Sequence, residues 1–187
     1  MKTGEEAVWL LIDRLNELGA DYMIVGSFSS NAYGIARSTK DADIVVQIDE
    51  ETRRKLLLSL PAEFQIDEQV TFETVTGHRR QILKLPKIPY VIELFDLGHE
   101  AFDRQRFANR VKTTIAGRSA WLPSANDVVI QKLRWATLAR RTQDLVDATN
   151  VISVSGGFLD WGYIEHWCGE LGIGAALEEA RKAARMD

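Results

Sequence analysis

The stretch that decides the fold of this protein is Tyr22–Val46, YMIVGSFSSNAYGIARSTKDADIVV. Its apolar start, Tyr22–Val25, predicts a short buried strand, and the Gly-Ser that follows predicts a turn. Ser27–Tyr33 is long enough for a short helix, Arg37–Lys40 is a polar loop, and Ala42–Ile48 is a second apolar strand. Strand, turn, helix, loop and strand in close succession favour a fold that combines helices with a sheet.

Two aspartates open the second strand. Asp41 and Asp43 are two residues apart, and side chains at that spacing in a strand point to the same face. Two carboxylates at a buried position repel each other and lose solvation, and a hard divalent cation such as Mg²⁺ relieves both costs. Gly26 and Ser27 begin the predicted helix, where backbone N–H groups and a hydroxyl bind anions. The combination indicates a nucleotide-and-metal site, and the alternative is a solvated strand end.

This arrangement resembles the signature of the DNA polymerase β-like nucleotidyltransferase superfamily, which is an apolar residue, Gly-Gly or Gly-Ser, a spacer, and Asp-x-Asp or Asp-x-Glu. Residues 7–150 look most like the small bacterial branch that contains the abortive-infection toxin transferases. The resemblance implies an α/β (α+β) fold, with a polymerase β-like nucleotidyltransferase core and a mixed sheet. It also implies an enzyme that moves a nucleoside monophosphate from an NTP to a hydroxyl acceptor and releases pyrophosphate.

A third carboxylate is expected on a later strand, where the superfamily carries one, usually an aspartate. Glu93 is the candidate because it stands alone in the apolar strand Tyr90–Phe95, and a buried strand tolerates an acid only when it is paired or metal-bound. Asp96 is the competitor, but it falls on the opposite face of a regular strand. We therefore expect Asp41, Asp43 and Glu93 to hold two Mg²⁺ ions and to be catalytic, with Glu93 also the candidate general base. The alternative for Glu93 is an edge position facing water.

Five residues are candidates for binding the triphosphate. Gly26 lets the backbone approach a phosphate, and Ser27 offers a hydroxyl to a terminal phosphate oxygen. Arg37 and Lys40 lie in the loop before the aspartates, where they either neutralise the triphosphate or are solvated. Lys132 follows Pro-Ser-Ala-Asn-Asp, and this resembles the superfamily's Pro-Ser-x-x-Asp motif, whose later lysine reaches toward the nucleotide. The alternative for Lys132 is a charge on a helix surface.

The chain is predicted to form a nucleotidyltransferase core over residues 1–122 and a helical portion over residues 123–187. Helical spacing or capping signals predict further helices at 5–18, 50–60, 127–139, 142–154, 160–171 and 175–186. Further strands are expected at 71–75, 81–85 and 90–95, and two short ones within 110–122. Asp144 and Asp147 are expected to form a local ion-pair network with Arg140 and Arg141 on one helix.

Composition is typical of a protein with one sizeable core. The 187 residues are 45% hydrophobic, and no apolar run reaches the length of a transmembrane helix. The first residues lack the apolar region of a signal peptide. Cys168 is the single cysteine, so an internal disulfide is excluded, and a place in the core is expected. The three histidines, of which His78 is one, show no metal-binding spacing and are expected to be structural or exposed. These features predict a cytoplasmic protein without a membrane partner.

The charge of the chain is unevenly distributed. Residues 104–141 contain nine basic residues and one acid, a net charge of +8, so the rest of the chain carries −12. Such asymmetry indicates a polyanion near this segment, or a set of solvated faces. With the toxin-like resemblance, it favours RNA or protein as the acceptor, and a cognate antitoxin as a partner. Two rival hypotheses are a small-molecule nucleotidyltransferase of the aminoglycoside type and a non-catalytic regulatory half of a toxin–antitoxin pair.

Overall fold

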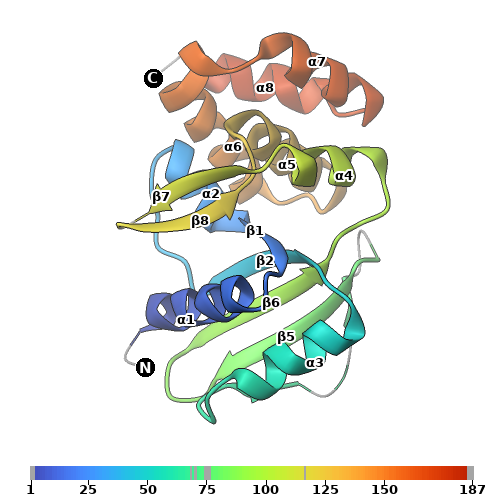
Figure 1. Ribbon diagram of the computed structural model, residues 1–187. Helices are drawn as coiled ribbons and strands as arrows, with labels where there is room; N and C mark the ends of the chain where they lie inside the picture. Colours follow the sequence, from blue (N-terminus) through green and yellow to red (C-terminus); the bar gives the residue numbers. More distant parts are fainter. Residues whose placement is uncertain (1–2, 68, 70, 74–76, 116, 185–187) are drawn as a thin grey trace.

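A mixed sheet lies at the centre of the protein (Figure 1). The computed structural model describes residues 3–67, 69, 71–73, 77–115 and 117–184. Over these residues the sheet has six strands, which are β1 (Asp21–Val25), β2 (Asp41–Gln47), β3 (Gln65–Ile66), β4 (Thr71–Phe72), β5 (Arg79–Leu85) and β6 (Tyr90–Asp96). Their order is β1-β2-β6-β5-β3, and β4 also pairs with β5.

The register of the central strands brings distant acids together. β1 runs antiparallel to β2 with Val25 opposite Asp43. β2 runs parallel to β6, and this pairing places Asp43 opposite Glu93. β5 runs antiparallel to β6, so the sheet contains both kinds of pairing. The predicted α+β class and mixed sheet are therefore confirmed.

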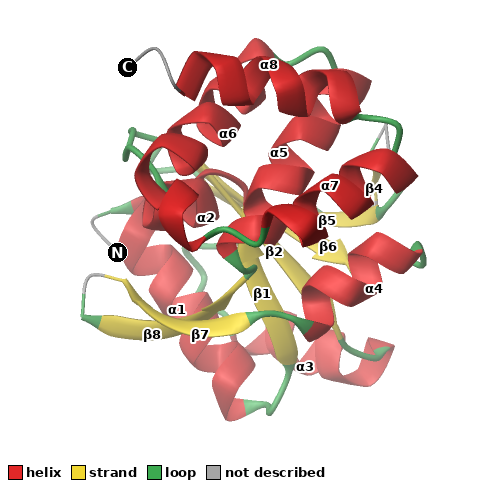
Figure 2. Cartoon of the chain, turned by 90° about the horizontal axis from the view of Figure 1, so that it is seen from above, coloured by secondary structure: helices red, strands yellow, loops and turns green. Residues whose placement is uncertain are grey.

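Helices cover both faces of this sheet (Figures 1 and 2). They are α1 (Gly4–Glu17), α2 (Gly26–Tyr33), α3 (Glu50–Ser59), α4 (Ala101–Ala108), α5 (Ala125–Leu138), α6 (Thr142–Ser155), the 3₁₀ turn η1 (Gly156–Phe158), α7 (Trp161–Glu170) and α8 (Gly174–Ala184). The helices α1 and α3 lie below the sheet in Figure 1, and α2 and the C-terminal helices lie above it. A hairpin of β7 (Val111–Ile115) and β8 (Arg118–Leu122) packs beside β1. In the described ranges, no helix has the length and apolar character needed to cross a bilayer.

Alternation along the strands separates the core from the opposite face of the sheet. Ile24, Ile44 and Val46 are buried in the main hydrophobic cluster, which includes the apolar faces of α1 and α3. Asp43 and Val45 alternate with these residues and therefore point to the other face. The apolar run of β2 thus anchors one face of the strand in the core while the other face presents carboxylates.

A second hydrophobic cluster holds the C-terminal helices together. It contains buried residues of α5 to α8, among them Leu133, Val151 and Cys168, together with Phe102 from α4. Burial raises the pKa of the Cys168 thiol to about 11, and the expected core position of this cysteine is confirmed. Since Phe102 joins this cluster from before residue 122, the division into 1–122 and 123–187 stays a prediction.

Helix α4 was not predicted from the sequence. Its buried face carries Asp103 and Arg106 as well as Phe102 and Phe107, so the apolar spacing that marks an amphipathic helix is missing. The hairpin expected at 71–75 and 81–85 is confirmed where it is described, because β4 pairs antiparallel with β5. Residues 74–76 lie outside the described residues.

The centre of β6 should be critical for stability. Leu94 is fully buried, so Leu94→Ala is expected to lower the free energy of unfolding by about 2–5 kcal/mol through lost burial and a residual cavity. Leu58→Ala on α3 is the matched control, because Leu58 is 75% exposed and its truncation should cost less than about 0.5 kcal/mol. Chemical denaturation of both variants measures the difference, and equal losses would contradict this packing.

Candidate active site

A cleft opens on the face of the sheet opposite α1 and α3. It has a cavity volume of about 210 Å³, with walls from β1, β2, β5 and β6 and from α2, α4, α5 and α6. The charged and titratable side chains that line it are Arg37, Asp41, Asp43, Glu73, His78, Arg80, Glu93, Arg106, Asp127, Lys132, Arg141 and Asp144. The sheet thus supplies the acids expected at the site, and the helices supply several basic groups.

The three predicted carboxylates meet in this cleft. Asp41 and Asp43 come from the start of β2, and Glu93 comes from the adjacent strand β6. Asp96 lies on the other face of β6, where it forms an ion pair with Arg53 of α3. It does not line the cleft, so Glu93 is the acid of β6 that can act beside Asp41 and Asp43.

Asp43 experiences the strongest electrostatic cost of the three. Burial, and then the nearby charges of Asp41 and Glu93, raise the pKa of Asp43 from 3.8 to about 7. Lys132 and Arg141 act in the opposite direction but do not offset this rise. Within the described ranges, no hydrogen-bond donor reaches the Asp43 carboxylate. This carboxylate is therefore placed where a cation would stabilise its charged form.

Gly26 makes the close approach of this carboxylate possible. Its φ is +63°, a left-handed conformation that favours glycine, and a Cβ at this position would lie 2.1 Å from Oδ2 of Asp43. Both the backbone conformation and the available space thus require glycine at the turn. The turn leads directly into α2, whose N-cap residue Val25 provides no side-chain hydrogen bond, so the first backbone N–H groups of the helix are open to an anion.

Ser27 is linked to β2 through a residue that sequence reasoning missed. The Ser27 hydroxyl donates a 2.9 Å hydrogen bond to Oγ1 of Thr39, and Thr39 donates in turn to the carboxylate of Asp41. A threonine in a polar loop gives no sequence signal for such a role. The position of Thr39 is set by the loop that connects α2 to β2.

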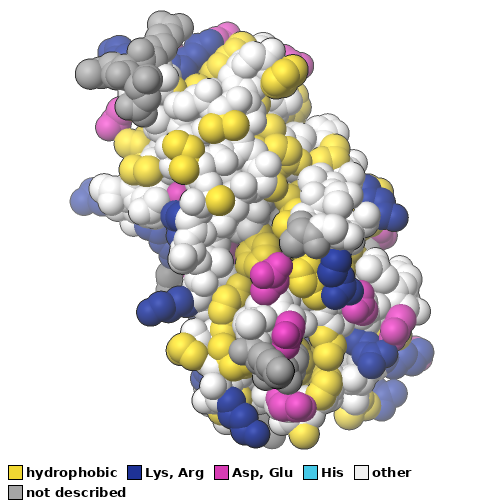
Figure 3. All heavy atoms as spheres, turned by 90° about the vertical axis from the view of Figure 1, so that its left-hand side faces the viewer, with side chains coloured by type: hydrophobic (Ala, Val, Ile, Leu, Met, Phe, Trp, Pro, Cys, Tyr) yellow, Lys and Arg dark blue, Asp and Glu magenta, His cyan; other side chains and the backbone are white. Residues whose placement is uncertain are grey.

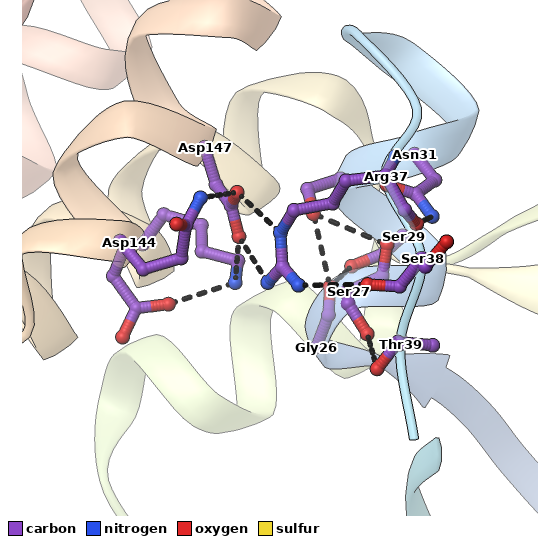
Figure 4. A network of polar contacts seen from close by, with 12 residues as sticks. Gly26, Ser27, Ser29, Asn31, Arg37, Ser38, Thr39, Asp144 and Asp147 are labelled. Carbon is purple, nitrogen blue, oxygen red and sulfur yellow. Dashed lines mark hydrogen bonds and ion pairs between the residues drawn. The ribbon is translucent and has the colours of Figure 1, made fainter. Parts of the chain in front are cut away.

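Lys132 and Arg37 meet on a pair of aspartates from α6 (Figure 4). Lys132 is only 7% exposed, and its Nζ donates hydrogen bonds of 2.7 Å to both Asp144 and Asp147. Arg37 binds Asp147 through two nitrogens, Nε at 2.9 Å and Nη2 at 3.0 Å. The expected pairing of Asp144 and Asp147 with Arg140 and Arg141 is therefore wrong: the two aspartates pair with Lys132 and Arg37, and Asp144 also lines the cleft.

This ion-pair network fixes the protonation state of its central acid. Burial alone would raise the pKa of Asp147, but hydrogen bonds from Arg37, Lys132 and Gln143 outweigh burial and lower it to about 2. The network connects the loop before β2 with α5 and α6. It therefore places two cations beside the acidic strand and ties the helical portion to the sheet.

Lys40 is not brought to the site. Its side chain is exposed and does not line the cleft, so the structure gives no support to a phosphate contact there. His78, expected to be structural or exposed, instead lines the cleft, and its Nε2 lies 3.3 Å from Oδ2 of the buried Asp103. Arg80 also lines the cleft and donates a 3.1 Å hydrogen bond to Glu93. Neither residue has a motif around it that sequence reasoning could have used.

The basic segment at 104–141 is largely neutralised. Arg110 pairs with Asp21 and Arg118 pairs with Asp13, which are acids from the N-terminal part of the chain. Arg134 pairs with Glu100, and Lys132 is held as described above. On the face in Figure 3, the Lys and Arg side chains lie apart and several are close to acidic ones. Acids that lie outside the segment in the sequence therefore offset part of its positive charge.

The donor chemistry of the site fits a hard cation. Within the described part of the chain, no three acidic, histidine or cysteine side chains stand close enough together to coordinate an ion as they are. Asp41 and Asp43 nevertheless share a face, and the carboxylate of Asp43 carries an electrostatic cost that a divalent cation would remove. Glu93 accepts a hydrogen bond from Arg80, so a metal ion would share the Glu93 carboxylate with that arginine. Asp41 and Asp43 are thus the best-placed ligands, with Glu93 beside them.

Comparison with solved structures identifies the fold. An antigenic nucleotidyltransferase-like protein from Paracoccidioides brasiliensis aligns with 98% of this chain and 94% of its own, with a TM-score of 0.61 and 22% identity. Lincosamide antibiotic adenylyltransferase LnuA, bound to lincomycin, gives a TM-score of 0.55 at 14% identity, covering 82% of this chain and 99% of its own. ANT(2")-Ia, in complex with adenylyl-2"-tobramycin, gives 0.51 at 14% identity, covering 97% and 96%.

These similarities show that the chain has the polymerase β-like nucleotidyltransferase fold. Comparison of the sequence with protein-family models and with curated proteins finds no match.

The charge of Asp43 should destabilise the protein when no cation is bound. Since its folded-state pKa lies above 3.8, the cost is absent at low pH and develops as the pH rises from about 4 to above 7. A pKa raised from 3.8 to about 7 corresponds to at most about 4 kcal/mol. In EDTA, Asp43→Asn should therefore exceed the wild type in free energy of unfolding at pH 8 by up to that amount, and by almost nothing at pH 4. Glu63→Gln, at an exposed acid, is the control, and a pH-independent difference for Asp43→Asn would contradict this electrostatic account.

The opposite pH dependence is expected at Asp147. Because its folded-state pKa is lowered to about 2, its stabilising effect is complete above about pH 4 and is lost as the pH falls through 2. Asp147→Asn should lower the free energy of unfolding by about 2–3 kcal/mol at pH 7, since it leaves Lys132 and Arg37 with fewer acceptors. Denaturation at pH 7 and pH 2 measures the change, with the exposed Glu170→Gln as control. A loss that is the same at both pH values would point to packing instead of charge.

Proposed function

We propose that this protein transfers a nucleoside monophosphate from an NTP to a hydroxyl group of a small-molecule acceptor, with Mg²⁺ as cofactor. The observation that carries the proposal is the meeting of Asp41, Asp43 and Glu93 in one cleft, beside the open helix start at Gly26. Nucleotidyl transfer needs acids for metal ions beside a cradle for phosphates. The shared fold of nucleotidyltransferases supports the same reading.

The triphosphate is best placed between α2 and the cations of the helical portion. The open N–H groups at Gly26 and the hydroxyl of Ser27 would bind terminal phosphate oxygens. Arg37 lies near this turn in Figure 4, Lys132 lines the same cleft, and both would contribute positive charge. Both are already held by Asp147, which fixes their positions before the nucleotide arrives and lowers the cost of ordering them on binding.

The reaction itself forms one bond and breaks another. The acceptor hydroxyl oxygen attacks the α-phosphorus, the bond between that phosphorus and the bridging oxygen of the β-phosphate breaks, and pyrophosphate leaves. Glu93 is the residue we assign to accept the hydroxyl proton, because it lies beside Asp43 and is oriented by Arg80. When bound by Asp41, Asp43 and Glu93, Mg²⁺ supplies electrostatic stabilisation of the entering and leaving oxygens. Two ions are expected on chemical grounds.

A small acceptor agrees better with the structure than RNA. Among the arginines of the 104–141 segment, Arg106 is buried and Arg110 and Arg118 are paired with acids, whereas Arg140 is exposed. Helices α5 and α6 form part of the wall of the cavity of about 210 Å³. A toxin-like role, a protein acceptor and a cognate antitoxin stay predictions that no contact in the structure favours.

The proposal is tested with NTPs labelled either at the α- or at the γ-phosphate. Incubation with Mg²⁺ and a fraction of small metabolites should transfer the α-label to a new product and release pyrophosphate. Asp41→Ala and Asp43→Ala should each lower the rate at least about hundredfold, since each removes a group that stabilises the transition state. Glu63→Gln should retain the wild-type rate.

Two outcomes would contradict the proposal. Full transfer by the Asp41→Ala and Asp43→Ala double variant would exclude these acids from catalysis. Transfer of the γ-label instead of the α-label would show phosphoryl transfer and not nucleotidyl transfer. Calorimetry adds an independent measurement, because Mg²⁺-dependent NTP binding should weaken in EDTA and in Lys132→Met.

A further inference from the structure

Arg106 is a buried cation with too few partners. It lies in the last turn of α4, is 5% exposed, and lines the cleft together with Val45 and Phe95. It donates no hydrogen bond to any of the described residues, and its Nε is buried without an acceptor. A guanidinium has five N–H donors and stays charged, so such burial is costly unless an anion binds there.

The nearest acid does not compensate Arg106 alone. Asp103 is fully buried and lies 3.4 Å from Nε of Arg106, but its carboxylate also lies 3.5 Å from Arg134 and 3.3 Å from His78. Gly98 leaves the space for this cluster, because a Cβ there would lie 2.3 Å from Asp103 and 2.4 Å from His78. The buried carboxylate of Asp103 thus lies close to three basic side chains, and the absence of a side chain at Gly98 leaves room for it and for His78.

Two further acids of the cleft wall are Asp127 and Glu73, and neither forms an ion pair with Arg106 among the described residues. Asp127 attracts Arg106 only at a distance, and its carboxylate is held by hydroxyls of Ser124 at 2.6 Å and Tyr163 at 2.7 Å. Glu100, which pairs with Arg134, lies at the surface.

Arg106 lies further along β2 than the Gly26 turn, which is the proposed site for the terminal phosphates. Gly26 follows Val25, which pairs with Asp43, so the cradle lies at the start of β2. Phe107, next to Arg106, packs on Met23 and Val45, and Val45 lies about 7 Å further along β2 than Asp43, at about 3.3 Å per residue. An anion bound at Arg106 would therefore lie about two residues further along β2 than the Gly26 turn.

We propose that Arg106, with His78 beside it, binds a phosphate or carboxylate group of the acceptor, so that the acceptor is an anionic hydroxyl compound. This assignment rests on the proposed nucleotidyl transfer. A planar guanidinium matches the paired oxygens of either group. The same charge disfavours a polycationic acceptor of the aminoglycoside type, because Arg106 would repel it. An acceptor anchored at Arg106 would share the cleft with Glu93, the residue assigned to accept its hydroxyl proton.

Inorganic phosphate is the probe that tests this subsite. Its binding to the full-length protein is measured by calorimetry for the wild type, Arg106→Met and Arg104→Met, first without nucleotide and then with saturating Mg²⁺ and NTP. Arg104 is exposed on the same helix and makes the matched control for loss of one positive charge. Arg106→Met should weaken phosphate binding at least tenfold, as expected for loss of a charged hydrogen bond. Arg104→Met should change it less than twofold, and wild-type binding should persist when the NTP is bound.

A second measurement does not depend on a stable Arg106→Met variant. In the wild type labelled with ¹⁵N-arginine, phosphate should shift the Nε–Hε signal of Arg106, assigned by its loss in Arg106→Lys. An unshifted signal, or equal phosphate affinity in Arg106→Met, would overturn the proposal. Phosphate binding that disappears when the NTP fills the cleft would assign Arg106 to the nucleotide's own phosphates and would also overturn it. A wild type that binds phosphate at Arg106 but no Mg²⁺–NTP would instead refute the proposed function alone.

Discussion

The crowding of carboxylates around Asp43 is the constraint on which the site depends. Asp43 is fixed between β1 and β6, with Asp41 on its own strand and Glu93 directly opposite. Gly26 removes the side chain that would otherwise occupy the position of its carboxylate. The core on the far side of β2 holds the strand in place and stabilises this unfavourable arrangement. This costly carboxylate is the group on which the proposed cation binding depends.

The helical portion completes the site through charge instead of through apolar contact alone. Lys132 and Arg37 come from segments far apart in the sequence, and both are held by Asp147. Cations beside a cluster of acids would otherwise collapse onto those acids or turn to solvent. Because α6 provides the acceptors Asp144 and Asp147, Lys132 and Arg37 pair with these aspartates and not with Asp41 or Asp43 among the described residues, and both cations line the cleft.

Pairing of charges over long sequence distances also affects the basic segment at 104–141. The +8 of residues 104–141 is a property of the chain and not of a surface, since acids from α1, β1 and the start of α4 neutralise much of it. Arg106 differs from exposed members of the segment such as Arg104 and Arg140, because it is buried in the cleft wall and shares its acid with two neighbours. A buried imbalance of this kind carries more information about a ligand than exposed charges that solvent screens.

Local sequence was enough to predict the strand–turn–helix–strand unit and the glycine at the turn where α2 begins. It also predicted that Asp41 and Asp43 share a face, because side chains in a strand repeat every two residues. It also placed Glu93 correctly on an apolar strand and on the face opposite to Asp96. The partners of Lys132 and Arg37 and the position of Lys40 outside the cleft could be seen only in the folded structure. The same holds for the places of His78, Arg80 and Arg106 in the cleft wall. These outcomes depend on which distant segments are brought together by the parallel pairing of β2 with β6 and by the packing of the helices α4, α5 and α6. Charge pairs between distant segments follow no periodicity, so the sequence pattern does not reveal them.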